Sequence, residues 1–241
     1  MSTPLMLSIS SPDKVLWPAA GIRKADYLQY LIAVSPYLLP HLIDRPITFI
    51  RFPHGVTGES FYQKNLPAHA PSWLASYVDT SGEKPIHYAL LNDLDSLLWA
   101  GNQNCLEIHP WYATSSRPTY PTQLAIDLDP TTDRFDDARE VAFYVRDALS
   151  GIGLVGYPKT SGQTGLQIYV PITPRYSFAE TRRVQQFLAE FIATRHPDAV
   201  TLERRVKARR ARVYLDYVQH APHKTLPAPY STRKHPQGTV S

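Results

Sequence analysis

Two aspartates one residue apart follow an apolar segment, in the run 124–130 (Leu-Ala-Ile-Asp-Leu-Asp-Pro). A β-strand turns successive side chains to opposite faces, so Asp127 and Asp129 are predicted to point the same way. Two carboxylates side by side repel each other, and a divalent cation such as Mg²⁺ or Mn²⁺ would bind both and remove the repulsion. Two solvated acids at the end of a strand would give the same pattern, so both interpretations stay open for this motif alone.

A third acid, Asp216, lies in the middle of residues 212–218, which are rich in β-branched and aromatic side chains. This composition predicts another strand. An acid is rarely buried in a strand unless it is paired or bound to a metal ion. If the two strands are neighbours, their three carboxylates can hold a pair of metal ions, which is the arrangement that two-metal phosphoryl transfer requires.

Positive charge is concentrated beside the third acid. The chain has a net charge of +4, and the segment from Glu203 to the end contains nine Lys and Arg residues against two acids. Arginines next to metal-binding carboxylates suit a polyphosphate substrate, whereas a solvated charged surface is the alternative. The basic residues that directly precede the Asp216 strand are Arg204, Arg205, Lys207, Arg209, Arg210 and Arg212.

The elements that must position these residues alternate between helices and strands. Apolar periodicity and caps predict helices over 24–42 (bent or split at Pro36), over 92–102 from an Asn92 cap, over 135–149, and from the Ser177–Glu180 capping box to about Arg195. Strands are expected over 47–52, 60–63, 106–111, 166–172 and 213–218, besides the one that ends at Asp129. From residue 123 onward this order predicts a small split βαβ sheet covered by helices.

Length and composition limit the classes of protein. A chain of 241 residues that is 43% hydrophobic forms one large or two small lobes. The stretch 110–121, rich in Ser, Thr and Pro, could divide a single domain, 1–241, into an N-terminal lobe, 1–115, and a catalytic lobe, 116–241. The one cysteine, Cys105, excludes an internal disulfide. Since the chain shows neither a secretory signal nor a run of about 18 apolar residues, we expect a cytoplasmic protein.

Eight short segments along the whole chain resemble, in the same order, the polymerase domain of bacterial ATP-dependent DNA ligase D. That domain is a member of the archaeo-eukaryotic primase superfamily and works in non-homologous end joining. The resemblance implies an α+β fold, with a primase-like catalytic core and an N-terminal α/β lobe packed on it, and a place at the bacterial nucleoid. The matching segments are 13–18 (DKVLWP), 45–46 (RP), 61–65 (FYQKN), 107–111 (EIHPW), 127–130 (DLDP), 159–162 (KTSG), 216–219 (DYVQ) and 229–233 (PYSTR).

The resemblance implies roles for residues that local patterns leave unexplained. Lys14 and Lys24 would hold the 5′-phosphate at a gap or break, although both could be ordinary surface lysines. Phe61 and Tyr62 would stack on template bases, which is tolerant of sequence; one ring in the core and one outside would also fit a strand. The metal-binding, catalytic residues would be Asp127, Asp129 and Asp216, with two Mn²⁺ or Mg²⁺ ions.

A nucleotide site is implied around a loop in which this chain departs from the family. The family's Ser-Gly-x-x-Gly-Leu-His pattern ends here in Gln167, and glutamine can donate a hydrogen bond but carries no charge. We therefore expect a functional site with weaker triphosphate affinity that depends on Arg209 for positive charge. The nucleotide-binding residues implied by the resemblance are His109, Ser161, Gln167, Arg209 and Arg233.

The sequence therefore predicts a template-directed nucleotidyltransferase, a DNA-directed DNA/RNA polymerase that extends a primer 3′-hydroxyl. The resemblance implies a preference for ribonucleotides over deoxynucleotides, and gap filling or overhang extension at DNA ends that carry a 5′-phosphate. It also implies an ATP-dependent ligase domain, in the same or another chain, and a Ku-like end binder as partners. The alternatives are a de novo primase, a non-catalytic DNA-end-binding module and, more remotely, a metal-dependent nuclease.

Overall fold

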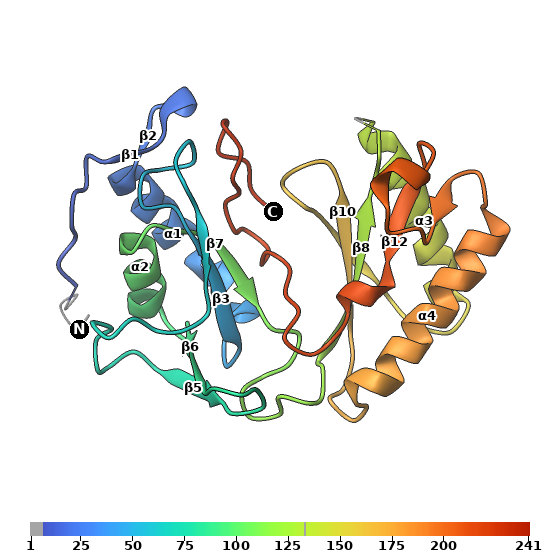
Figure 1. The fold of residues 1–241 in the computed structure, drawn as a ribbon, viewed down its shortest axis with the longest axis horizontal. Helices are drawn as coiled ribbons and strands as arrows, with labels where there is room; N and C mark the ends of the chain where they lie inside the picture. The colour runs from blue at the N-terminus through green and yellow to red at the C-terminus, as the bar shows by residue number, and fades with distance from the viewer. Residues whose placement is uncertain (1–6, 133) are drawn as a thin grey trace. The chain divides into compact units, whose positions relative to one another are not determined.

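The computed structural model describes residues 7–132 and 134–241, which form two compact units (Figure 1). The first unit contains the described residues up to Trp111 together with Leu226–Ser241, and the second contains Tyr112–Thr225. The change from one unit to the other falls within the Pro-rich stretch that the sequence pointed to. The end of the chain differs from the expectation, because it returns to the first unit instead of staying with the catalytic lobe.

Strand β3 (Pro46–Arg51) lies at the centre of the sheet in the first unit. It pairs with β7 (Cys105–Pro110), with β4 (Phe61–Gln63) and with β6 (Ile86–Leu90), and β5 (Ser76–Asp79) pairs with β6, all of them antiparallel. Every residue of β7 is buried. A separate hairpin pairs β1 (Val15–Trp17) with β2 (Ile22–Arg23).

Two helices cover this sheet. Helix α1 (Lys24–Leu38) continues through Pro36 and ends in a 3-10 turn, and α2 (Leu94–Asn102) packs closely against it. A Cβ at Gly101 would come within 2.6 Å of a Leu31 methyl group, so the absence of a side chain lets the helices approach. The N-cap of α2 is Asp93, which accepts from the Ser96 amide at 2.8 Å, and not the predicted Asn92.

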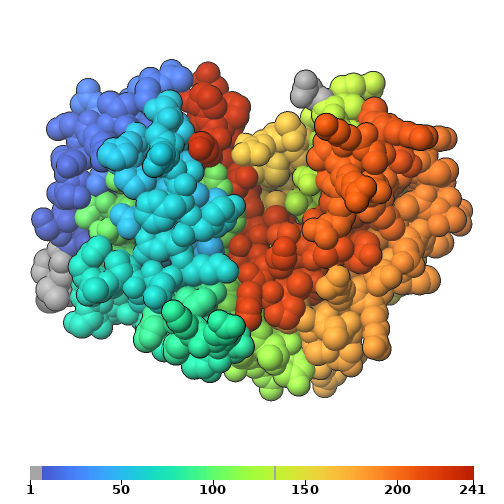
Figure 2. Space-filling view, in the orientation of Figure 1, coloured from blue at the N-terminus to red at the C-terminus, as the bar shows by residue number. Residues whose placement is uncertain are grey.

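The returning C-terminal segment is fixed to β7 by hydrogen bonds. Ala228 N donates to Ile108 O at 2.9 Å, and Ile108 N donates to Ser231 Oγ at 2.9 Å. Thr232 Oγ1 donates to Leu106 O at 2.5 Å. In Figure 2 the last residues, in dark red at the top of the view, lie against the blue and cyan part of the same unit. This segment therefore completes the first unit.

The second unit is built on a five-stranded sheet with the order β11-β12-β8-β10-β9. Strand β10 is antiparallel to both of its neighbours, β8 and β9, so β8, helix α3 and β9 form a split βαβ unit with β10 between its strands. A split βαβ sheet was predicted, but its second strand, β9, was not. Strand β11 is parallel to β12. The elements are β8 (Gln123–Asp129), α3 (Phe135–Ser150), β9 (Tyr157–Thr160), β10 (Leu166–Pro171), α4 (Phe178–Arg195), β11 (Val200–Thr201) and β12 (Val213–Asp216).

Helices α3 and α4 pack on one face of this sheet (Figure 1). Leu124, Ile126 and Leu128 of β8 point into the apolar core that lies under these helices. Because strand side chains alternate, the residues between them face away from the helices. The other face is thus left for polar side chains. No helix in the described ranges combines the length and hydropathy needed to cross a membrane.

Candidate active site

Three carboxylates share the face of the second unit's sheet that the helices leave uncovered. Asp127 and Asp129 are two residues apart on β8 and so point the same way. Strand β12 is the direct neighbour of β8, with Asp216 opposite Asp127. Residues opposite each other in an antiparallel pair lie on the same face, so the strand pairing expected from the sequence brings the three acids together.

The acids on β8 resist ionisation. Burial, followed by the charges of Asp129 and Asp216, raises the pKa of Asp127 to about 7. Burial and the charge of Asp216 also raise the pKa of Asp129, although the Arg209 guanidinium opposes this shift. The pKa values of Asp127 and Asp129 are raised for the same reason: both carboxylates are buried near like charges and have too few positive partners. The row of carboxylates therefore carries a repulsion that a cation would relieve.

Asp216 is held in place by its own turn. Its Oδ1 accepts from Val218 N at 3.0 Å and from Gln219 N at 3.1 Å, at the start of the short 3-10 helix Tyr217–Gln219. Tyr214 donates its hydroxyl to the same oxygen at 3.0 Å. These contacts fix the orientation of the carboxylate before any ligand binds.

The donor set suits a hard divalent cation. It consists of carboxylate oxygens, which are the ligands that Mg²⁺ and Mn²⁺ prefer. Within residues 7–132 and 134–241, no three Asp, Glu, His or Cys side chains already converge as a metal-binding group. The chemistry of the three carboxylates fits such a cation, as do the raised pKa values of the two acids on β8.

The row of side chains continues across the sheet from Asp127. Gln167 on β10 lies opposite Asp127, and Lys159 on β9 lies opposite Gln167. A hydrogen bond from Gln167 and the charge of Lys159 both favour the ionised form of Asp127. Gln167 is buried, and its Oε1 has no hydrogen-bond partner among the described residues. From the sequence alone, Lys159 has no role beyond its place in a family motif. The strand register brings it close to the carboxylates.

The loop after Lys159 is closed on itself by Ser161. Ser161 Oγ accepts from Gln163 N at 3.2 Å and from Gly165 N at 3.0 Å. A Cβ at Gly165 would lie 2.3 Å from Leu128 O, so only glycine lets the loop approach β8. The two amides are already used within the loop, whereas the Ser161 hydroxyl can still donate its own hydrogen to a ligand.

Arg209 lies beside the carboxylates and is largely buried. Its guanidinium donates to Glu203 O and to Arg204 O, both at 3.1 Å, and lies 4.1 Å from the centre of the Tyr214 ring. These contacts fix one cation near Asp129, whose pKa it lowers. The sequence had indicated a basic run, and the structure shows which of its members is held at the site.

The other two residues of the predicted nucleotide site, His109 and Arg233, lie in the first unit and share a buried carboxylate. His109 Nε2 is 3.0 Å from Glu107 Oε2, and Arg233 Nη1 donates to the same oxygen at 2.5 Å. Lys234 N donates to Glu107 Oε1 at 2.7 Å. Burial opposes ionisation of Glu107, but these three partners hold its pKa below the usual value. Glu107 was not among the predicted site residues, and its spacing of two from His109 was the available signal.

The two lysines predicted to hold a 5′-phosphate differ in exposure. Lys14 is half-buried, whereas Lys24 is buried and its Nζ donates to Ser10 O at 2.8 Å and to Asn102 O at 2.9 Å. Burial and the charges of Lys14 and Arg51 lower the pKa of Lys24. The lysines and Arg51 therefore form one cationic cluster, and Arg51 is the member that sequence reasoning missed.

The predicted aromatic pair is exposed on both faces of β4. Phe61 is 46% exposed and Tyr62 is 70% exposed, so neither ring enters the core. The Arg51 guanidinium lies 5.5 Å from the centre of the Phe61 ring. Both rings are thus available for stacking, with a cation of the same cluster beside one of them.

Residues 23–241 match the family described as LigD, primase-polymerase domain. The bifunctional non-homologous end joining protein LigD of Bacillus subtilis (strain 168) is 42% identical over 238 residues, which is 98% of this chain and 38% of that protein. The multifunctional non-homologous end joining protein LigD of Mycolicibacterium smegmatis is 35% identical over 240 residues, or 97% of this chain and 31% of the relative. The chain thus spans about a third of the length of these relatives.

A solved structure has the same fold. It is the polymerase domain from Mycobacterium tuberculosis Ligase D in complex with DNA, with a TM-score of 0.92 and 31% sequence identity. The match covers 98% of this chain and 85% of that one.

Proposed function

The chain belongs to the LigD primase-polymerase domain family, whose chemistry is nucleotidyl transfer, and from this premise we propose that it extends DNA primers during end joining. The substrate is a gap or break that bears a 5′-phosphate, and ribonucleotides are preferred over deoxynucleotides. The observation that carries the proposal is the register that aligns Asp127 with Asp216 on the uncovered face of the sheet.

The reaction joins the primer to a nucleotide. The 3′-hydroxyl of the primer loses its proton to solvent and its oxygen forms a bond to the α-phosphorus, the bond from that phosphorus to the bridging oxygen breaks, and pyrophosphate leaves with the electron pair. Divalent cations of the Mg²⁺ and Mn²⁺ class, held by Asp127, Asp129 and Asp216, would supply activation of the hydroxyl and neutralisation of the phosphate charge.

The side chains beside the acids orient the carboxylates and bind the nucleotide. The Gln167 amide orients the Asp127 carboxylate, and Arg209 places positive charge beside Asp129. The Ser161 hydroxyl is available to donate to a phosphate oxygen. In the first unit, we keep for His109 and Arg233 the nucleotide-binding role that the family resemblance implies, and Glu107 orients both side chains.

The first unit supplies the features for binding DNA. We assign the 5′-phosphate to Lys14 and Lys24 with Arg51 beside them, since three neighbouring cations favour a doubly charged phosphate. The exposed rings of Phe61 and Tyr62 would stack on template bases. The relatives are longer end-joining proteins with more than one function, so we propose a ligase domain, in the same or another chain, and a Ku-like end binder as partners.

Primer extension on a gapped duplex with Mn²⁺ tests the proposal. The substrates differ in a 5′-phosphate or 5′-hydroxyl at the gap and in NTPs or dNTPs. Asp127→Ala is the blank, and Asp136→Ala, which removes an exposed acid on α3, is the matched control. Extension that the phosphate stimulates and that only Asp127→Ala abolishes is expected. Extension indifferent to the phosphate would indicate a primase, and its absence in the unsubstituted chain would leave a DNA-binding module.

A further inference from the structure

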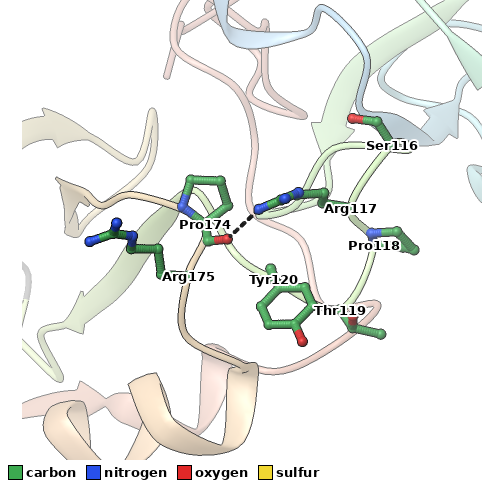
Figure 3. A pocket seen from close by; sticks show the side chains of 7 residues that line it. All are labelled: Ser116, Arg117, Pro118, Thr119, Tyr120, Pro174 and Arg175. Carbon is green, nitrogen blue, oxygen red and sulfur yellow. Dashed lines mark hydrogen bonds between the residues drawn. The ribbon is translucent and has the colours of Figure 1, made fainter.

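A hollow of about 470 Å³ lies in the second unit between two loops to which the proposed polymerase reaction assigns no role. One loop precedes β8 and provides Arg117, Thr119 and Tyr120, and the other follows β10 and provides Pro174 and Arg175 (Figure 3). The catalytic acids lie at the opposite end of β8, and a strand of 7 residues spans about 20 Å. The hollow is therefore separate from the carboxylate row.

The charge of the hollow is positive and uncompensated. Neither Arg117 nor Arg175 has an ion pair within the part of the chain that the structure describes. Arg117 Nη1 donates to Pro174 O at 3.0 Å, which fixes its guanidinium at the rim. None of the residues that line the hollow is acidic. Such a surface attracts an anion.

The arrangement of the side chains favours an extended anion. In Figure 3 the two guanidinium groups lie on opposite sides of Pro174 and do not converge on one point. The Tyr120 ring lies below Arg117 in that view and is 40% exposed, so part of the ring is open to a ligand. Separate cations flanking an exposed aromatic ring form the combination that binds single-stranded nucleic acid, through its phosphates and through base stacking.

We propose that this hollow is a second nucleic-acid site, which binds a single-stranded segment through phosphate contacts to Arg117 and Arg175 and a base stacked on Tyr120. The proposal stands on the second unit alone. It differs from the proposed 5′-phosphate cluster and template-stacking rings, which belong to the first unit.

Binding of fluorescein-labelled oligodeoxythymidine, followed by anisotropy in EDTA at several KCl concentrations, tests the proposal. Removing one phosphate contact with Arg175→Gln should reduce the slope of log K against log [KCl] by about 0.7. Tyr120→Ala should weaken binding about tenfold with the slope unchanged, because stacking releases no counterion. The matched control is Arg146→Gln, which removes an exposed guanidinium from α3 and should change neither quantity.

Two further measurements keep the test decisive. Irradiation of an oligonucleotide that contains 4-thiothymidine should crosslink it to the peptide that contains Tyr120. Both variants should extend a gapped primer without an overhang as well as the unsubstituted chain, so loss of this site and loss of polymerase activity are separate results. Unchanged affinity and slope in both variants, absence of the crosslink, or equal competition by polyglutamate of matched charge would each overturn the proposal.

Discussion

Buried carboxylates in the two units have opposite electrostatic states. Glu107 of the first unit receives hydrogen bonds from His109, Arg233 and the backbone, and its pKa is lowered despite burial. Asp127 of the second unit faces two other acids, and its pKa is raised. Burial disfavours the charged form of both, so the difference lies in the partners. The first carboxylate is neutralised within the protein, whereas the role that we propose for the second is to bind a cation.

The strongest test of the contrast between Glu107 and Asp127 removes the charge of Asp127. Asp127→Asn should reduce primer extension about 10⁴-fold, or about 5 kcal/mol of transition-state stabilisation, because a carboxylate is lost from the proposed metal site. The same change should leave the free energy of unfolding equal or higher, since it removes a repelling charge. Extension assays and urea unfolding measure the two quantities. Strong destabilisation would contradict the contrast.

Removing Glu107, the neutralised acid, should instead lower the free energy of unfolding. Glu107→Gln leaves the Arg233 guanidinium buried without a counter-ion, and breaking a buried pair costs about 3–5 kcal/mol. Urea unfolding measures the loss. Glu59→Gln, at an exposed position of the same unit, is the control and should stay within about 0.5 kcal/mol of the unsubstituted chain. A loss of stability no larger than that of the control would show that the ion pair between Glu107 and Arg233 does not stabilise the first unit.

A third buried group, His220, extends the comparison to pH. Burial, with the charge of Arg182, lowers the pKa of His220 to about 4 in the folded chain. Nε2 bonds to Thr181 Oγ1 at 2.9 Å, and Nδ1 has no partner among the described residues, so a second proton finds no acceptor. The unfolded chain protonates near pH 6.5, so stability is lost as the pH falls from about 6.5 to about 4.

The loss at His220 should approach about 3 kcal/mol at the acidic end of this window. Chemical unfolding at a series of pH values would show it. His220→Gln should flatten the slope in that window while lowering stability at neutral pH. An unchanged slope would mean that other groups control the acid sensitivity.

Cation binding should stabilise only those variants of the chain that keep the three carboxylates Asp127, Asp129 and Asp216. At a Mn²⁺ concentration of about 100 times the dissociation constant, the free energy of unfolding should rise by about 2.7 kcal/mol. Thermal melting with and without EDTA measures this increase. Asp127→Asn should lose most of it and Glu107→Gln should keep it. Equal stabilisation of both variants would place the cation elsewhere.

The smallest expected effect concerns the position opposite Asp127. Gln167→His should lower the apparent KM for the nucleotide about threefold, because histidine can carry a positive charge beside the triphosphate. Initial rates at varied NTP concentrations measure it, with Gln163→His in the exposed part of the loop as the control. An unchanged or higher KM would show that Gln167 does not limit nucleotide affinity.

The sequence predicted the strands that carry Asp127, Asp129 and Asp216 because their apolar alternation is strong and these acids interrupt it. It predicted the split βαβ unit from the order of elements. The strands β1, β2, β5, β6, β9 and β11 were missed, since short strands whose pairing is decided by the sheet leave little local pattern. Lys24 illustrates a second limit: a lysine at the start of a helix normally reads as exposed, and only the fold brings the backbone carbonyls that surround it.

Glu107 and Arg233 show why the first unit was harder to predict than the second. The two residues are separated by 126 positions and become partners because the end of the chain returns to β7. No local pattern reports such a pair. The acids of β8 and β12, by contrast, lie on strands that are recognisable one at a time, and only their adjacency had to be inferred.

The return of residues Leu226–Ser241 to the first unit also affects the order of events on the ribosome. The second unit occupies a continuous stretch of chain and can fold as soon as it has emerged, although it is synthesised later than most of the first. Until Arg233 emerges, Glu107 has no guanidinium partner and β7 lacks the hydrogen bonds of Ser231 and Thr232. The first unit therefore completes its fold only after all of the second unit has been synthesised.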